Sequence, residues 1–460
     1  MQRWRRSDAA QGQAVRQPGR DLQRRALGLA LGLLLTAGCT GAAPPVRPDR
    51  PTPTPTPTLA APTPTPEAQD MPTPGETTTP LGSPGWPLSP TPGGVTPLPP
   101  TPSPAVTLGP SPEPAHTAAP AGAQPVVERV AGGLDFPLTL AFLPDGRLLV
   151  GEKAGRVRVV ERGRLREEPL LTVDVASDTE AGLLGLAVYQ DSLGQPYLYA
   201  YYSYRGEGGL RNRVARGRLL GDRPGPEEVV LEDIPGAPRH NGGVIAFAPD
   251  GTLYITTGDA EQWDRAQDPD TLQGKVLRVE PAGAVPADNP FPGSPVYALG
   301  VRNAFGLAFH PATGRGYFTD NMVDRADELN LLAPAGNYGW PEVVGRAGEP
   351  AYVDPLLDFT PTTAPTLLVF VRGTRYPERY RGALLMAEWN TGALKRIALA
   401  PPAYDRVVAQ EVVLKQRCCL IALAQGPDGY LYYTTADGVY RIVSLPPTVG
   451  APTPWVRGQG

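Results

Sequence analysis

Short stretches in which apolar and polar residues alternate recur along the chain from about residue 125 onward. The plainest stretch surrounds the sequence Pro249-Asp250-Gly251, with Val244 and Ala246 before it and Leu253 and Ile255 after it. Alternation with a period of two is typical of a strand with one buried face. Pro-Asp-Gly favours a tight turn because proline presets φ and glycine tolerates positive φ. The segment is therefore predicted to be a β-hairpin.

About six hairpins of this kind follow one another at a spacing of roughly 40–60 residues, which is typical of propeller blades with four strands each. A hairpin unit that cannot bury its apolar face alone must stack on a neighbour or close into a ring. We therefore predict an all-β fold, a six-bladed β-propeller over residues 125–446, in which the first strand (126–130) and the last (439–443) share one blade. The predicted units lie at 142–160, 186–203, 247–256, 309–319, 382–399 and 426–432.

The first 39 residues are predicted to be a signal peptide. Several arginines precede an apolar run at 26–37 that is too short to span a membrane comfortably. The run ends in Leu35-Thr36-Ala37-Gly38-Cys39, which resembles a bacterial lipobox with Cys39 as the lipidated residue. An ordinary secretory signal with a chance cysteine is the alternative. Either interpretation predicts export to the cell envelope. The lipobox adds a lipid anchor on the outer face of the cytoplasmic membrane as the only membrane contact; a periplasmic or extracellular location is also open.

Residues 40–124 consist mostly of Pro, Thr, Ser, Gly and Ala, with a literal Pro-Thr repeat from residue 51. Such a segment has too little apolar surface to offset the entropy of ordering, so a disordered, extended linker is predicted. It would serve as a stalk, although a tolerated low-complexity insert has the same composition. Residues 447–460 are predicted to form a loose tail.

The formal net charge is -4, and no basic patch is present, which argues against a nucleic-acid partner. Three cysteines do not make a disulfide framework. Cys418 and Cys419 are adjacent. They would either form a strained ring in an oxidising compartment or serve as two small buried side chains in a strand.

The predicted propeller contains an ordered set of motifs: Gly182-Leu183-Leu184-Gly185-Leu186-Ala187, His240-Asn241-Gly242-Gly243, residues 266–279, Pro286-Ala287-Asp288-Asn289-Pro290-Phe291, Leu299-Gly300-Val301-Arg302-Asn303, Asp327-Glu328-Leu329-Asn330 and Gly336-Asn337-Tyr338-Gly339-Trp340-Pro341. This set resembles the glucose/sorbosone dehydrogenase family, the soluble sugar dehydrogenases that depend on pyrroloquinoline quinone (PQQ). The resemblance implies oxidation of aldose sugars to lactones, with PQQ and Ca²⁺ as cofactors and a membrane quinone or a cytochrome as electron acceptor.

His240 matches the catalytic base of the family. A neutral imidazole suits proton removal from the anomeric hydroxyl at neutral pH while hydride leaves for the quinone. Without the resemblance, a strand-end histidine held by backbone would explain the residue. Arg302 and Asn303 match the pair that holds the cofactor, because a guanidinium fork pairs with carboxylates and stabilises a developing negative charge. An arginine paired with a nearby aspartate is the alternative.

Three further positions follow from the resemblance. Glu180 stands where some members have a glutamine that contacts the cofactor. Asp327 and Glu328 lie in the segment that binds calcium in the family, and hard oxygen ligands suit that ion. The Gly-Pro that many members have upstream is Met322-Val323 here, and a solvated acidic turn is the alternative.

At several positions the charged residues differ from those of the family. Arg239 replaces an acid found in some members before the histidine, Asn390 replaces a cofactor-contacting lysine, and only Arg417 remains near the position of a late arginine pair. We predict Arg239, Asn390 and Arg417 as candidate cofactor contacts. Arg239 would replace positive charge that the family has elsewhere around the cofactor.

Two other functions fit the same fold. One is a non-enzymatic propeller that binds carbohydrate or a protein partner, which the lost cations favour. The other is a calcium-dependent hydrolase of the lactonase kind, in which Asn241, Asn303 and Asp320 would ring the metal. Fold alone does not decide among these functions.

Overall fold

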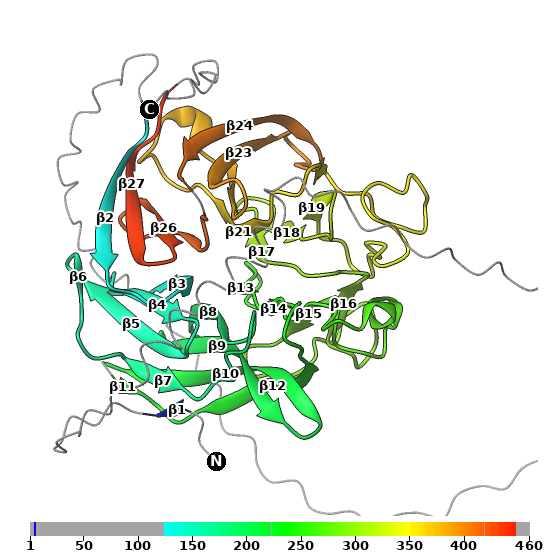
Figure 1. The fold of residues 1–460 in the computed structure, drawn as a ribbon, viewed down its shortest axis with the longest axis horizontal. Helices are drawn as coiled ribbons and strands as arrows, with labels where there is room; N and C mark the ends of the chain where they lie inside the picture. The colour runs from blue at the N-terminus through cyan, green and yellow to red at the C-terminus, as the bar shows by residue number, and fades with distance from the viewer. Residues whose placement is uncertain (1–3, 6–123, 222, 418, 448–460) are drawn as a thin grey trace, which may run out of the picture. The chain divides into compact units, whose positions relative to one another are not determined.

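The computed structural model describes residues 4–5, 124–221, 223–417 and 419–447, and the statements below concern these residues. Six β-sheets lie around a common centre like the blades of a propeller (Figure 1). The predicted all-β, six-bladed architecture is therefore confirmed. The predicted signal peptide with Cys39 and the predicted linker lie outside the described residues except for Trp4–Arg5 and Gln124. Cys418 and the tail beyond residue 447 also lie outside them.

Each sheet is antiparallel and begins with its innermost strand. The first sheet contains β3 (Pro137–Phe142), β4 (Leu148–Glu152), β5 (Arg156–Glu161) and β7 (Leu171–Val173), with the short β6 (Arg164–Leu165) on β5 and β1 (Trp4–Arg5) on β7. The second contains β8 (Leu183–Gln190), β9 (Pro196–Gly206), β10 (Gly209–Leu220) and β12 (Glu228–Pro235), with β11 (Arg223–Pro224) on β10. The third contains β13 (Ile245–Phe247), β14 (Leu253–Thr256), β15 (Lys275–Val279) and β16 (Val296–Leu299).

The remaining three sheets repeat this plan. The fourth contains β17 (Gly306–Phe309), β18 (Gly316–Asp320), β19 (Asp327–Leu331) and β20 (Leu357–Phe359). The fifth contains β21 (Pro365–Phe370), β22 (Leu384–Glu388), β23 (Ala393–Leu399) and β24 (Val407–Lys415). The sixth contains β25 (Leu423–Gln425), β26 (Leu431–Thr435), β27 (Gly438–Ser444) and, from the other end of the domain, β2 (Val126–Gly132).

The pairing of β2 with β27 closes the ring. Val127 lies opposite Ile442 in this antiparallel pair, so the sixth sheet combines the first strand of the domain with its last three. This confirms the predicted shared blade. Closure through a mixed blade leaves no innermost strand without neighbours, which restricts exposed edges to the outer strands.

The core lies between neighbouring blades. All five residues of β4 and all four of β14 are buried, because both faces of an inner strand pack on adjacent sheets. One cluster joins Leu149 and Val157 of the first blade to Leu186 and Leu198 of the second. Helical structure in the described residues amounts to two 3-10 turns, η1 (Trp263–Gln267) and η2 (Glu378–Tyr380), and neither is long enough to cross a bilayer.

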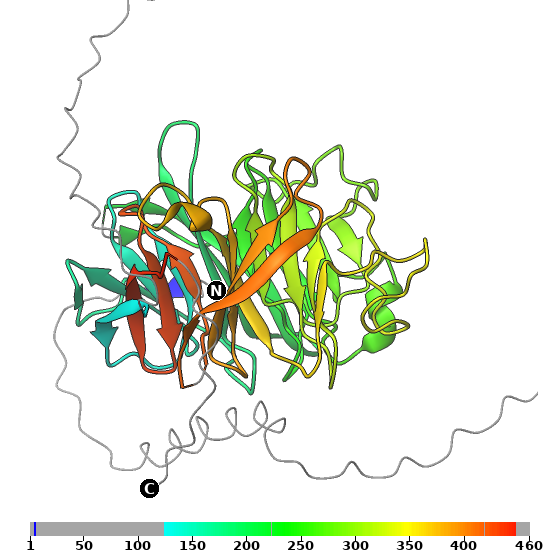
Figure 2. The ribbon, with the colours of Figure 1, turned by 90° about the horizontal axis from the view of Figure 1, so that it is seen from above.

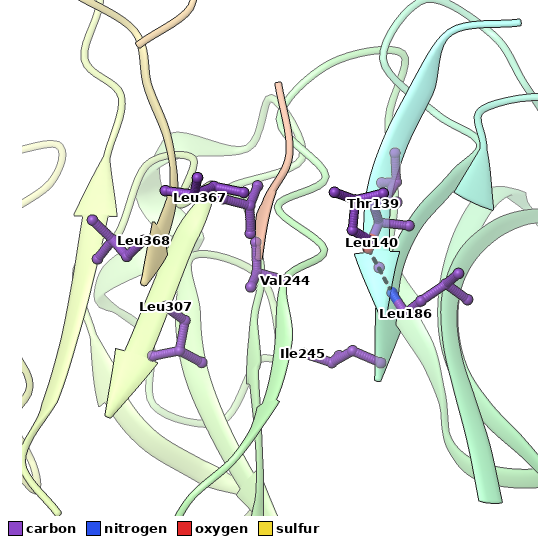
Figure 3. Close-up of a pocket in the computed structure, with 11 residues that line it drawn as sticks. Thr139, Leu140, Leu186, Val244, Ile245, Leu307, Leu367 and Leu368 are labelled. Atoms are coloured by element: carbon purple, nitrogen blue, oxygen red, sulfur yellow. Dashed lines mark hydrogen bonds between the residues drawn. The ribbon is translucent and has the colours of Figure 1, made fainter. Parts of the chain in front are cut away.

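A cavity of about 150 Å³, lined mainly by Leu, Val and Ile residues, lies among the innermost strands (Figure 3). Its lining comes from innermost strands or the residues just before them, for example Leu186, Ile245, Leu307 and Leu368. The N–H of Leu186 donates to Oγ1 of Thr139 at 3.0 Å, which joins the first two blades at the wall of this cavity. None of its lining side chains is titratable, so the reactive groups have to be sought in the loops at the ends of the strands.

Candidate functional site

The side chains that the sequence analysis singled out lie at the end of the propeller where the innermost strands begin. Glu180 precedes β8, His240 precedes β13, and Arg302 and Asn303 precede β17. Because the strands alternate in direction, the loops β14–β15, β18–β19 and β22–β23 reach the same end. The strands run between two loop-covered faces (Figure 2), and the contacts below all belong to one of them.

The backbone of His240 is held in the left-handed region, with φ of 59°. Its N–H donates to Oε2 of Glu180 at 2.8 Å, and its carbonyl accepts from the N–H of Ala260 at 3.0 Å. Gly258 makes the second contact possible, because a Cβ there would lie 2.1 Å from the His240 carbonyl oxygen. A non-glycine residue keeps such a conformation only where its surroundings enforce it, and strain of this kind clusters at functional sites.

The imidazole of His240 is oriented by a buried carboxylate. Its Nδ1 lies 2.8 Å from Oδ1 of Asp259, which is fully buried, and Oδ2 of Asp259 accepts from the indole N–H of Trp340 at 2.8 Å. An ionised carboxylate only accepts hydrogen bonds, so the ring proton resides on Nδ1 and the lone pair on Nε2. The arrangement leaves Nε2 as the nitrogen that can take a proton.

The guanidinium of Arg302 lies on the other side of this ring. Its Nη2 is 3.0 Å from Nε2 of His240, and its Nη1 donates to the carbonyls of Asn321 at 2.6 Å and Met322 at 3.1 Å. The group also lies over the ring of Trp340, 5.3 Å from the centroid. Its Nε is buried and has no hydrogen-bond partner within the described residues. A buried N–H without an acceptor fits an anionic ligand such as the carboxylates and quinone oxygens of PQQ.

Asp320 fastens Arg302 and Asn303 to the fourth blade. Its two carboxylate oxygens accept the backbone N–H groups of Arg302 at 2.8 Å and Asn303 at 2.6 Å. Burial raises the pKa of Asp320 to about 6, although these two N–H groups and the Arg302 charge pull the pKa down. The side-chain carbonyl of Asn303 accepts from the N–H of Gly242 at 3.1 Å, which links this loop to the one that carries His240.

The carboxylates predicted to bind calcium have other partners. Asp327 accepts the backbone N–H groups of Met322, Thr363 and Ala364 at 2.7–2.8 Å. Glu328, the next residue on β19, accepts from Gly345 N–H and the Asn330 amide. Successive side chains of a strand point to opposite faces, and no group of three acidic, His or Cys side chains in the described ranges is arranged for a metal. The geometry does not fit a calcium site at this pair, and calcium binding stays a prediction from the resemblance.

No hydrogen bond joins the side chains of three other candidate cofactor contacts, Arg239, Asn390 and Arg417, to the His240 ring, Asp259 or Arg302 within the described residues. Arg239 is exposed and pairs with Glu261 at 2.7 Å, so its charge is partly compensated. The Asn390 amide donates to the carbonyl of Thr362 at 3.3 Å. Arg417 is exposed. The fourth candidate, Glu180, accepts a hydrogen bond from the His240 backbone N–H. Its carboxylate therefore helps to position the base, independently of any contact with a cofactor.

Sequence reasoning missed three residues of this site. Asp259 closely follows the short buried run of β14, and Trp340 lies within a recognised motif, but nothing local connects either to His240. Lys153 is half-buried, with Nζ donating to the Ser177 carbonyl at 3.1 Å. Burial lowers the pKa of Lys153, and the charges of Asp178, Asp135 and Glu180 oppose that shift. Lys153 therefore adds a partly buried amine bonded to the loop that also carries Glu180, at a face where several family cations are replaced.

Oxygens proposed for the hydrolase alternative are also engaged. The Asn241 side-chain oxygen accepts from the Asn212 amide and from Ala237 N–H, and Asp320 and Asn303 make the backbone bonds described above. Cys419, the second residue of the adjacent cysteine pair, is disulfide-bonded, and its φ is 62°.

Comparison with known proteins places these observations in a family. The family model described as Glucose / Sorbosone dehydrogenase matches residues 134–443. The aldose sugar dehydrogenase YliI of Escherichia coli K12 is 28% identical over 354 residues, covering 70% of this chain and 92% of that protein.

Solved structures agree with that match. The PQQ-bound form of an aldose sugar dehydrogenase from Streptomyces coelicolor has a TM-score of 0.61 and 32% identity, covering 70% of this chain and 99% of that one. A protein from Thermus thermophilus, described as a candidate oxidoreductase (glucose dehydrogenase), has a TM-score of 0.63 and 42% identity, covering 69% of this chain and 99% of that one.

Proposed function

The chain belongs to the glucose/sorbosone dehydrogenase family of oxidoreductases, and we propose that it oxidises aldose sugars to lactones with PQQ as its cofactor. The observation that carries this proposal is the pair formed by His240 and Asp259, 2.8 Å apart, with Nε2 of the imidazole on the side of Arg302. A ring held in this tautomer by a buried carboxylate has the orientation of a general base, with Nε2 as the proton acceptor once Arg302 no longer donates to it.

The anomeric hydroxyl of the sugar would give its proton to Nε2 of His240. Asp259 would stabilise the imidazolium that forms, because it accepts from Nδ1 in both protonation states. When bound, PQQ supplies the quinone that accepts the hydride from the anomeric carbon. Loss of proton and hydride from the same C–OH group leaves the lactone carbonyl, so the atoms and electrons balance.

The residues that would hold the cofactor are Arg302, through its unpartnered Nε, together with Asn303 and Lys153. Arg302 would also stabilise negative charge as the quinone is reduced. The indole of Trp340 lies against both Arg302 and Asp259, so it keeps water from the ion pair that forms during the reaction.

The electron acceptor and the location of the protein are proposed from the sequence and the family resemblance alone. We propose a membrane quinone or a cytochrome as electron acceptor, reached by a protein that is exported and anchored through Cys39. A role for Ca²⁺ is supported by the family resemblance, and Asp327 and Glu328 would have to give up their backbone partners to bind it.

A PQQ titration of the full chain tests the proposal. We expect saturable binding by absorbance with and without Ca²⁺, followed by dye reduction that depends on an aldose and is lost in His240→Ala while the cofactor still binds. Well-folded protein that binds no PQQ would refute the dehydrogenase function and favour a carbohydrate- or partner-binding propeller.

A further inference from the structure

Trp263 is the one aromatic residue among the large hydrophobic side chains that are exposed in the described part of the chain, with 59% of its surface accessible. It begins the short turn η1 in the loop β14–β15, the same loop that carries Asp259. A tryptophan buries a large apolar area when it is covered. Its exposure on a loop of the candidate site therefore points to a ligand that covers it during function.

The position of Trp263 relates it directly to the base. Its ring lies 6.4 Å from that of Trp340, centroid to centroid, with an angle of 61° between the planes. Trp340 in turn donates to Asp259 and lies under the guanidinium of Arg302. Trp263 is thus separated from the groups that orient and cover His240 by a single indole ring.

The loop that presents Trp263 is rigidly connected to the site. Ala260 and Glu261 both have positive φ, 50° and 59°, which is unusual for two consecutive non-glycine residues. Oδ1 of Asp259 accepts the N–H of Glu261 at 2.9 Å as well as the His240 ring. Lys275, which is fully buried, donates to the carbonyls of Arg265 and Ala266 inside η1. The same carboxylate therefore orients the base and the segment that leads to Trp263.

Polar groups accompany the exposed indole. Glu261, which pairs with Arg239, lies two positions before it in the same loop, and Asp264, the next residue, is exposed. An aromatic face beside charged hydrogen-bonding groups suits a pyranose, whose C–H face stacks on the ring while its hydroxyls bond to the charges.

We propose that Trp263 forms a second sugar-binding subsite, which stacks against the glycosyl unit next to the reducing end of an oligosaccharide. This inference rests on the proposed function, because it places the reducing-end sugar at His240. Trp263 makes the enzyme favour oligosaccharides over monosaccharides. It does not contact the reacting atoms, which lie near His240, Asp259 and Arg302.

The experiment compares glucose with maltotriose in the full chain loaded with PQQ. We expect Trp263→Ala to lower kcat/KM for maltotriose about tenfold, mainly through KM, and to change kcat/KM for glucose by less than about twofold. Trp263→Phe, which keeps an aromatic face, should retain most of the maltotriose preference. Val412→Ala, at an exposed apolar position on β24, is the control and should change neither substrate.

A binding measurement separates this inference from the proposed function. Calorimetric titration of maltotriose into wild type and Trp263→Ala does not depend on turnover, and we expect roughly fivefold weaker binding, or more, in the variant. If no sugar is oxidised but this difference is found, the dehydrogenase function fails and the subsite stands. If affinity is unchanged, or if glucose and maltotriose lose activity equally, the subsite is refuted; an equal loss that varies with the electron acceptor would assign Trp263 to the acceptor instead.

Discussion

The guanidinium of Arg302 lies 3.0 Å from Nε2 of His240, the nitrogen on which the proposed reaction depends. Because Nδ1 carries its proton toward Asp259, the lone pair of Nε2 accepts a hydrogen bond from Arg302. A lone pair in this state cannot also accept a proton from a sugar. A ligand that draws the Arg302 fork toward itself therefore frees the base, which couples cofactor binding to catalytic competence.

Replacing Arg302 tests this coupling. Arg302→Gln removes the charge and the fork, and we expect the Kd for PQQ to rise about 10- to 100-fold, as for the loss of a charge-assisted hydrogen bond. Absorbance titration measures the affinity. Arg325→Gln, at an exposed arginine on the loop β18–β19, is the matched control, and equal affinities in the two variants would contradict the assignment.

Asp259→Asn should disturb the orientation of the His240 ring without abolishing the binding of PQQ. An amide cannot satisfy both the His240 ring N–H and the Trp340 indole N–H, so either the tautomer reverses or a buried donor loses its partner. We expect kcat to fall about 10³–10⁴-fold, in the range known for a catalytic histidine held in the wrong tautomer, while PQQ still binds. A variant that keeps wild-type kcat would show that Asp259 does not govern the base.

Lys275 should stabilise the fold through its contacts with the loop β14–β15. Its Nζ donates to the carbonyls of Arg265, Ala266 and Gln273 at 2.7–3.1 Å, and burial lowers its pKa to about 7. Lys275→Met leaves three buried carbonyls without this donor, and we expect a loss of about 2–4 kcal/mol in the free energy of unfolding. Thermal or denaturant unfolding measures it against Lys415→Met, where the lysine is exposed and the cost should be small.

Stability should decline as the pH rises from about 4.5 to about 8 because of Glu328. Burial raises the pKa of Glu328 from 4.5 to about 8, and the charge of Asp320 adds to the shift. A carboxyl whose folded pKa is raised contributes its stability fully below the unfolded pKa, and the contribution is lost as pH rises toward the folded pKa. We expect the unfolding free energy to fall by about 3–5 kcal/mol between roughly pH 4.5 and 8 through this group.

Glu328→Gln provides the check on that pH dependence. The glutamine side chain cannot ionise, so the unfolding free energy of the variant should vary less between about pH 5 and pH 9 than that of wild type. The variant should be the more stable of the two proteins at the alkaline end. Parallel pH profiles for the two proteins would exclude Glu328 as the titrating group.

The predicted anchor gives a separate test on whole cells. Cys39→Ser should abolish lipidation and release the protein from the membrane fraction, because the thioether that carries the lipid needs the Cys39 sulfur. Mass analysis of the mature N-terminus measures this directly. An unmodified Cys39 in a soluble exported protein would instead support the ordinary secretory signal.

Much of the fold was predictable because its signals are local. Pro249-Asp250-Gly251 and the alternation around it specify the hairpin β13–β14 within a short stretch of chain, and the other blades repeat that signal. The strand patterns at 126–130 and 439–443 predicted the pairing of β2 with β27, since a ring of hairpins needs a closing partner.

The candidate site was predictable only in part. His240, Arg302 and Asn303 stand in motifs similar to the family, and the structure brings them together. Asp259 and Trp340, which hydrogen-bond to each other, are 81 positions apart in loops of different blades, and no spacing rule connects them. The metal interpretation of Asp327 and Glu328 did not foresee the backbone N–H groups of Thr363 and Ala364, which arrive from the next blade.

Residue patterns along the chain were enough to specify the class of fold, the number of blades, the closing blade and the histidine at the mouth of β13, because turn residues and a two-residue period act over short distances. The contacts of His240 depend instead on how the blades pack. Ring closure brings loops from separate blades to one face, so that Glu180, Asp259 and Arg302 converge on a single residue from 60, 19 and 62 positions away. Hydrogen bonds and charges act through space, and their partners are set by that packing rather than by neighbours along the chain.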